Sequence, residues 1–120
     1  MEDLRWPSGS YKSIAIIDLS REQLERWFGR NLVTGTEPGL GEWLACGGLL
    51  PSGQMVEFVQ YAHAATPAGF ELRCDSDAES RTVISDTLAA LGLTESSIRW
   101  RRSESSLKNA AEPAAVRLLP

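Results

Sequence analysis

Residues 13–28, SIAIIDLSREQLERWF, decide the fold, because they contain an interior strand followed at once by a capped helix. Residues 13–19 are apolar or β-branched on both faces, which is typical of a strand inside a sheet. Ser20 and Gln23 then form the S-x-x-Q pattern of a capping box. We expect a helix from residue 21 to about residue 29 or 32. Its inward side chains would be Leu24, Trp27 and Phe28.

The same order of strand and helix returns at residues 70–93. Alternation predicts three inward side chains, Phe70, Leu72 and Cys74, and three outward ones, Glu71, Arg73 and Asp75. Ser76 and Glu79 form a second capping-box pattern, and Gly92 stands where a left-handed residue ends a helix. The core expected from both units contains Ile16, Leu24, Trp27, Phe28, Phe70, Leu72, Val83, Ile84, Leu88 and Leu91.

A last strand is expected over residues 97–102, with Ile98 and Trp100 facing inward. Arginines at positions 99, 101 and 102 surround that tryptophan. Basic residues with an interleaved aromatic occur in strands that bind RNA. Alternatively, these arginines pair with acidic residues of a neighbouring strand.

The turn Pro-Ser-Gly occurs twice, at residues 7–9 and 51–53, and both copies have strand-like flanks. Proline and glycine suit successive turn positions, so we expect a hairpin at each site. Residues 34–41, TGTEPGLG, are expected to form a loop, as are residues 62–69.

These elements predict an α+β fold with a mostly antiparallel sheet of five to six strands. Two amphipathic helices would cover one face. The order resembles the ferredoxin-like arrangement with added strands. We expect a single domain over residues 1–102 and a C-terminal extension over residues 103–120.

Composition is that of an ordinary globular domain, with 42% hydrophobic and 23% charged residues. The net charge of −4 argues against binding to nucleic acid or an anionic membrane. No stretch has the features of a signal peptide or the length of a membrane span. Cys46 and Cys74 are expected to be reduced and buried, so we expect a cytoplasmic location, although one disulfide is the alternative.

Motifs for phosphate, metal or acyl-enzyme chemistry are not found in the sequence. His63 is the single histidine, and a catalytic pairing with Cys46 or Cys74 would require contacts that a sequence does not reveal. We therefore name no catalytic residue, no metal ligand and no cofactor, and we expect a protein that is not an enzyme.

Charge is distributed unevenly along the chain. Between Arg30 and Arg73 there is no lysine or arginine, while four glutamates lie there: Glu37, Glu42, Glu57 and Glu71. This acidic window is either a chance pattern or an acidic face that docks a basic partner. In the second case the partner-binding residues would be Glu37, Glu42 and Glu57, with Trp43 as the apolar anchor if it is exposed.

The first functional hypothesis is a non-enzymatic binding protein that docks a partner with a basic surface. In size and charge the chain resembles bacterial immunity proteins, which block toxins. The alternative is a small-molecule-binding or regulatory domain of ferredoxin-like type. A third possibility is a small enzyme that uses His63 or carboxylates. The sequence does not determine the oligomeric state.

Overall fold

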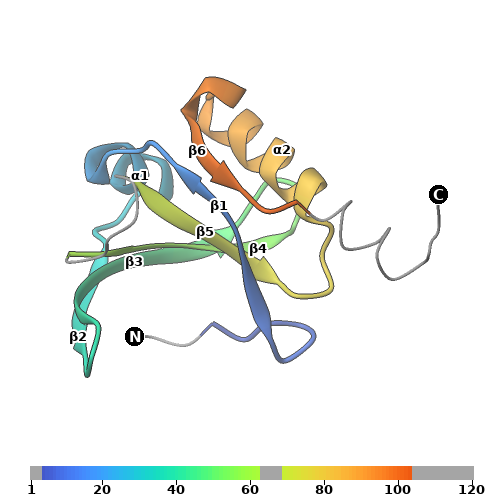
Figure 1. Ribbon diagram of the computed structural model, residues 1–120. Helices are drawn as coiled ribbons and strands as arrows, with labels where there is room; N and C mark the ends of the chain where they lie inside the picture. Colours follow the sequence, from blue (N-terminus) through green and yellow to red (C-terminus); the bar gives the residue numbers. More distant parts are fainter. Residues whose placement is uncertain (1–3, 63–68, 104–120) are drawn as a thin grey trace.

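Six strands form one sheet in the computed structural model, which describes residues 4–62 and 69–103 (Figure 1). The elements in chain order are β1 (Tyr11–Ile17), α1 (Arg21–Phe28), β2 (Val33–Glu37), β3 (Gly41–Leu49), β4 (Met55–Tyr61), β5 (Phe70–Asp75), α2 (Ser80–Leu91), η1 (Glu95–Ser97) and β6 (Ile98–Arg101). The expected extension, residues 103–120, lies outside the described residues apart from Ser103.

The strands follow the order β2-β3-β4-β5-β1-β6, and every neighbouring pair is antiparallel. This confirms the predicted α+β class and the antiparallel sheet. Both helices lie on one side of the sheet, and the segment before β1 passes on the opposite side (Figure 1). The sheet therefore has a helix-covered face and a second face, which we call the open face.

The capping box predicted for α1 is confirmed. The Ser20 hydroxyl accepts the N–H of Gln23 at 3.1 Å, and the Gln23 side chain accepts the N–H of Ser20 at 2.8 Å. Gly29 ends the helix in the left-handed conformation, with φ of 71°. Local sequence thus fixes both ends of α1.

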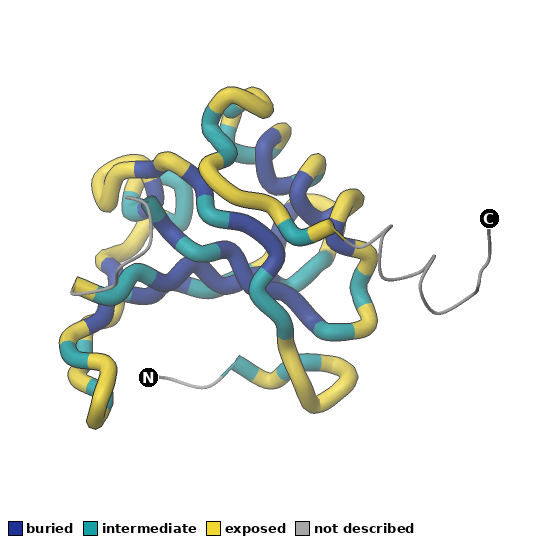
Figure 2. Tube along the Cα trace, in the orientation of Figure 1, coloured by how far each residue is buried: buried dark blue, intermediate teal, exposed yellow. Residues whose placement is uncertain are grey.

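The main core lies between the helices and the sheet, as Figure 2 shows by the buried central strands. Seven of the ten predicted core residues have side chains that join or pack against this core from the helices, and Phe70 and Leu72 contribute from β5. Phe28 packs edge-on against Phe58, with ring centroids 6.1 Å apart. Gly48 permits this contact, because a methyl group there would lie 2.7 Å from the Phe28 ring. Ile16 is the exception, because it faces the other side of the sheet.

Only one of the two predicted Pro-Ser-Gly hairpins forms. At residues 51–53 the turn joins β3 to β4, with Gly53 donating to the Leu50 carbonyl at 2.8 Å. At residues 7–9 the turn is present, but the described residues before it form no strand. The segment before β1 instead crosses the open face, where Ser8 donates its N–H to the Asp75 carboxylate and Leu4 lies against Gly47.

The loop predicted for residues 34–41 is wrong, because most of this stretch belongs to a second hairpin, β2–β3. Pro38 and Gly39 occupy its turn, and Gly39 has the positive φ of 83° that a type II turn requires. Gly35 lies inside β2 although glycine weakens strands. Its place is explained by Trp43, whose ring covers the position where a methyl group would otherwise lie.

The second capping box is also wrong, because α2 begins at Ser80 with Glu79 as its N-cap residue. Residues 76–78 instead form a turn organised by Asp75, whose carboxylate accepts the N–H of Asp77 at 2.8 Å. The C-terminal end follows the prediction: Gly92 is left-handed, and the N–H of Leu93 donates to Leu88 at 2.8 Å.

Trp100 was expected in the core but is 43% exposed on the open face. The cause is a register shift between β1 and β6: Ile17 pairs with Ile98, whereas its neighbour Ile16 pairs with Trp100. A shift of one residue moves a side chain to the other face of a sheet. Ile16 is outside the main core because it alternates along β1 with Ala15 and Ile17, which belong to that core.

Both cysteines are buried and free, as expected. In the part of the chain that the structure describes, no helix has the length and apolarity required to cross a membrane.

Candidate functional site

The open face combines apolar and charged side chains from all six strands. One row of paired positions crosses the whole sheet: Val33, Ala45, Val59, Glu71, Ile16 and Trp100. A second row joins Gly47, Glu57, Arg73 and Ser13. The register therefore brings residues as far apart in sequence as Ile16 and Trp100 onto one surface.

Part of this face is covered by the segment before β1. Leu4 lies against Gly47, where a methyl group would come within 2.7 Å of its side chain. Further along, the N–H of Ser8 donates to the Asp75 carboxylate at 2.7 Å, and the Trp6 ring lies 5.8 Å from the Tyr11 ring. The N–H groups of Asp77 and Ser8 lower the pKa of Asp75 below its ordinary value. The segment is thus held on the face by both apolar and charge-assisted contacts.

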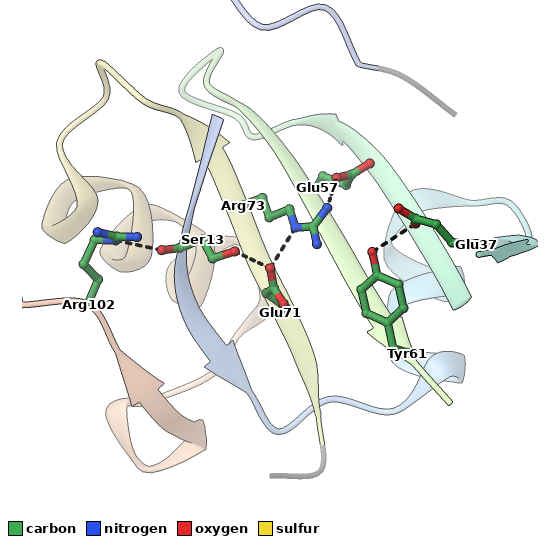
Figure 3. Close-up of polar contacts among 7 residues, drawn as sticks. All are labelled: Ser13, Glu37, Glu57, Tyr61, Glu71, Arg73 and Arg102. Atoms are coloured by element: carbon green, nitrogen blue, oxygen red, sulfur yellow. Dashed lines mark hydrogen bonds and ion pairs between the residues drawn. The ribbon is translucent and has the colours of Figure 1, made fainter. Parts of the chain in front are cut away.

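A polar network centred on Arg73 occupies the middle of the open face (Figure 3). Its Nε donates to Glu71 at 2.8 Å, and its Nη1 lies 3.5 Å from Glu57. The hydroxyl of Ser13 also donates to Glu71. Arg73 and Glu57 are 7% and 6% exposed, so this ion pair is buried although it belongs to the face without helices.

Aromatic rings border the network. The Arg73 guanidinium lies 5.1 Å from the centroid of Tyr11, within the range of a cation–π contact. The Tyr61 hydroxyl donates to Glu37 at 3.3 Å. Burial disfavours the charged guanidinium, but hydrogen bonds with Glu71 and Tyr61 outweigh it, so the pKa of Arg73 is raised. Arg73 is therefore a permanent cation shared by its carboxylate neighbours.

A small apolar cluster lies beside the network, formed by Trp43, Ala45 and Val59 with Tyr61 packed against them. Trp43 is 5% exposed, because its ring lies flat on Gly35 of the neighbouring strand. Around this cluster and the network, four large hydrophobic side chains of the open face are between 43% and 62% exposed. They are Tyr11, Val33, Leu49 and Trp100.

The four residues predicted to bind a partner do not share one exposed surface. Glu37 lies at the end of β2 on the open face, whereas Glu42 is exposed on the helix side of β3. Glu57 is buried beside Arg73, and Trp43 is buried, so Trp43 does not meet the condition set for an anchor. Whether any of them contacts a partner stays a prediction.

The acidic window is partly compensated in the folded chain. Arg73, the first residue after the window, pairs with both Glu57 and Glu71. Sequence reasoning missed Arg73 and Tyr61, which the network depends on. The signal that could have found Arg73 is the β4–β5 pairing, because antiparallel neighbours place Glu57 opposite Arg73.

The arginines near β6 are engaged in local contacts. Arg99 pairs with Asp18 at 2.8 Å, and Arg101 pairs with Glu95 at 2.5 Å. The Nε of Arg102 donates to the carbonyl of Ser13 at 2.8 Å (Figure 3). These contacts favour pairing with acidic neighbours over an RNA-binding strand, although the acids belong to connecting segments and not to a strand.

Described residues line at least two hollows beside the sheet. One, of about 430 Å³, lies over β2, β3 and β4 and is lined by Thr34, Gly35, Thr36, Glu42, Trp43, Leu44, Gln60 and Ala62. The other, of about 300 Å³, is lined by Leu4, Arg30, Asn31, Val33, Ala45, Cys46, Gly47 and Glu57. Burial raises the pKa of the Cys46 thiol, opposed by Arg30, so this thiol is a weak nucleophile near neutral pH.

His63 lies outside the described residues, so its expected loop is not described. Within residues 4–62 and 69–103, no three histidine, cysteine or acidic side chains are grouped so that they could hold a metal ion.

No protein-family model matches the chain, and neither a curated protein nor a solved structure is significantly similar to it.

Proposed function

We propose that the chain is a non-enzymatic binding domain that docks a partner protein on the open face of its sheet. One observation carries this proposal: within residues 4–62 and 69–103, four of the five exposed large hydrophobic residues belong to that face. The four are Tyr11, Val33, Leu49 and Trp100. They lie on β1, β2, β3 and β6, so the proposed interface extends across the sheet. Exposed apolar surface marks interaction sites, and aromatic residues are enriched among interface anchors.

Charge supports a basic partner. Among the described strand residues of the open face, carboxylates outnumber cations: Glu37, Glu57, Glu71 and Asp75 stand against Arg73. The excess of acid would attract a basic surface over a distance of about one Debye length, roughly 8–10 Å. Its main effects would be faster encounter and selection of the partner, while the exposed aromatics supply most of the affinity.

The narrower form of the proposal is an immunity-type inhibitor that blocks a basic toxin domain. Buried free thiols at Cys46 and Cys74 support a reducing compartment such as the cytoplasm. The order β4-β5-β1-β6, with α1 and α2 as crossovers, supports a ferredoxin-like arrangement to which hairpin β2–β3 is added. This fold alone carries little functional information.

A second candidate function is the binding of a small molecule in the hollow over β2, β3 and β4. Its volume of about 430 Å³ is within the range of ligand pockets. The side chains of Thr34, Thr36 and Gln60 offer hydrogen-bonding groups there. If this hollow is the functional site, substitutions on the open face should leave the affinity for the small molecule unchanged.

The test compares three versions of the full chain as bait for proteins of its source cell. L49S/W100S removes two exposed anchors from the open face, and L40S removes from the β2–β3 turn a leucine whose exposure, 52%, lies between their 62% and 43%. We expect wild type and L40S to retain the same partner, with affinity that falls as salt rises, and L49S/W100S to lose it. A partner retained equally by L49S/W100S would refute docking on the open face.

A further inference from the structure

The two edge strands of the sheet differ in how well they are protected. Strand β6 has four residues, a shifted register against β1, and ion-paired arginines at positions 99 and 101. Strand β2 pairs with β3 at five consecutive positions without any shift. Short length, bulges and charges discourage an edge from pairing with another chain. The register shift and the charged residues therefore protect β6, whereas β2 has no register shift and carries charge only at Glu37.

The outer side of β2 carries free pairing capacity. Within the described residues, β2 is hydrogen-bonded to β3 alone, so its other side presents a row of backbone groups. The segment Val33–Glu37, VTGTE, contains no lysine and no proline. Its Thr34 and Thr36 side chains are exposed, and Val33 is 43% exposed. Such an edge is a template for a further strand.

We propose that β2 pairs antiparallel with β2 of a second copy of this chain, about a two-fold axis at Gly35. In this register Thr34 lies opposite Thr36 of the second copy, and the reverse pair forms on the other side of the axis. Cross-strand threonine pairs are favourable in antiparallel sheets. Glycine at the axis leaves no pair of side chains directly opposite one another at that position. The contact uses the same residues on both copies, so it closes at a dimer.

Charges at the two ends of β2 favour a second copy of the chain as the partner and an antiparallel orientation of the two strands. Arg30 precedes the strand and is exposed, with its guanidinium donating to the Gly47 carbonyl and lying over the Phe28 ring, whereas Glu37 is the last residue of the strand. Antiparallel self-pairing brings the acidic end of each strand towards the basic end of the other. Parallel pairing would instead bring like charges together, which is unfavourable.

The dimer is expected to be weak. A pair of five-residue strands buries far less than the roughly 1,200–2,000 Å² of stable interfaces. Association should therefore depend on protein concentration. Strand β2 shares Val33 and Glu37 with the open face but does not contain the anchors Leu49 and Trp100. The L49S/W100S variant, which tests docking, should therefore leave dimerisation unchanged.

Two matched variants test the proposal, because they differ only in the sign of one new charge. T34K/T36K places lysine opposite lysine at both pairs across the axis, whereas T34K/T36E places lysine opposite glutamate. Both sites are exposed, so each variant should fold, and circular dichroism and the unfolding midpoint check this. The first variant changes the formal net charge from −4 to −2, which lowers overall repulsion between copies. A weaker dimer in T34K/T36K would therefore be caused by the lysines at the β2 edge and not by the change in net charge.

The measurement is sedimentation equilibrium of the full chain over a wide concentration range. The apparent mass of the wild type should rise from 13.1 kDa towards twice that value as concentration increases. T34K/T36K should dimerise at least about tenfold more weakly, and T34K/T36E should dimerise as tightly as wild type or more so. A wild-type mass that stays at 13.1 kDa, or equal dimerisation by wild type and T34K/T36K, overturns the proposal. T34K/T36E behaving like T34K/T36K overturns the antiparallel register.

Discussion

Replacing Arg73 with methionine should destabilise the fold far more than removing an exposed arginine. Arg73 is 7% exposed and is shared by Glu57 and Glu71, at 3.5 and 2.8 Å. Methionine keeps much of the aliphatic stem but removes the cation. The carboxylate of Glu57, which is itself buried, then loses its charged neighbour on β5. Removing one partner of a buried pair leaves a charge whose desolvation is no longer offset.

The expected loss for R73M is about 3–5 kcal/mol of unfolding free energy, as for other broken buried pairs. A domain of this size has a total of about 5–15 kcal/mol, so the loss would be a large part of it. Urea unfolding followed by tryptophan fluorescence measures this loss as a lower midpoint with an unchanged slope. The control is R21M, which breaks the exposed pair between Arg21 and Glu25 and should cost about 0.3–0.5 kcal/mol.

The double variant R73M/E57M separates an unpaired charge from lost packing. If the loss comes from a buried carboxylate deprived of Arg73, removing Glu57 as well should restore a large part of the stability, because buried pairs can be replaced by apolar residues. The double-mutant cycle gives the coupling between the two sites. A loss below about 1 kcal/mol for R73M, or a coupling near zero, would show that the network is ordinary surface and refute the reasoning.

Two further predictions concern local contacts. S20A removes the N-cap of α1 and should lower the unfolding free energy measured in urea by about 1 kcal/mol. E79A should lower it less, because the Glu79 side chain caps no N–H of α2. Equal losses in the two variants would contradict the capping role of Ser20. The lowered pKa of Asp75 means that its carboxylate adds stability that is complete above the unfolded value near 3.9 and is lost as pH falls through the folded pKa. The stability difference between wild type and D75N should therefore shrink below about pH 4, and a difference that stays constant from pH 7 to pH 2 would contradict this linkage.

Local signals in the sequence predicted the elements whose determinants lie close together in the chain. The cap of α1 depends on Ser20 and Gln23, three residues apart, and its left-handed end depends on Gly29 alone. By contrast, Gly35 resembles a strand breaker until Trp43 is known to lie across it from the neighbouring strand. Strand β2 was not predicted because the contact that makes glycine acceptable in it, the Trp43 ring over Gly35, comes from the neighbouring strand.

The side of the sheet on which a side chain lies was predictable only where the strand is regular. The alternation of β5 correctly placed Phe70, Leu72 and Cys74 towards the helices. It did not predict that Arg73 and Asp75, on the other side, are also buried, because their cover comes from neighbouring strands and from the segment before β1. At Trp100, a register shift of one residue reversed the predicted face, and nothing in the residues of β6 marks such a shift.

The candidate site illustrates why charge must be summed over a face of the fold and not over a stretch of sequence. The acidic window between Arg30 and Arg73 has a net charge of −4, and that count is correct. Yet pairing of β4 with β5 brings Arg73 opposite Glu57, and pairing of β2 with β3 turns Glu42 away from the face that holds Glu37. Of the four glutamates, two share one buried cation, and a third points to the helix side. Under the proposed docking on the open face, affinity would therefore come mainly from its exposed aromatic and aliphatic side chains, and acidic residues would mainly speed the encounter.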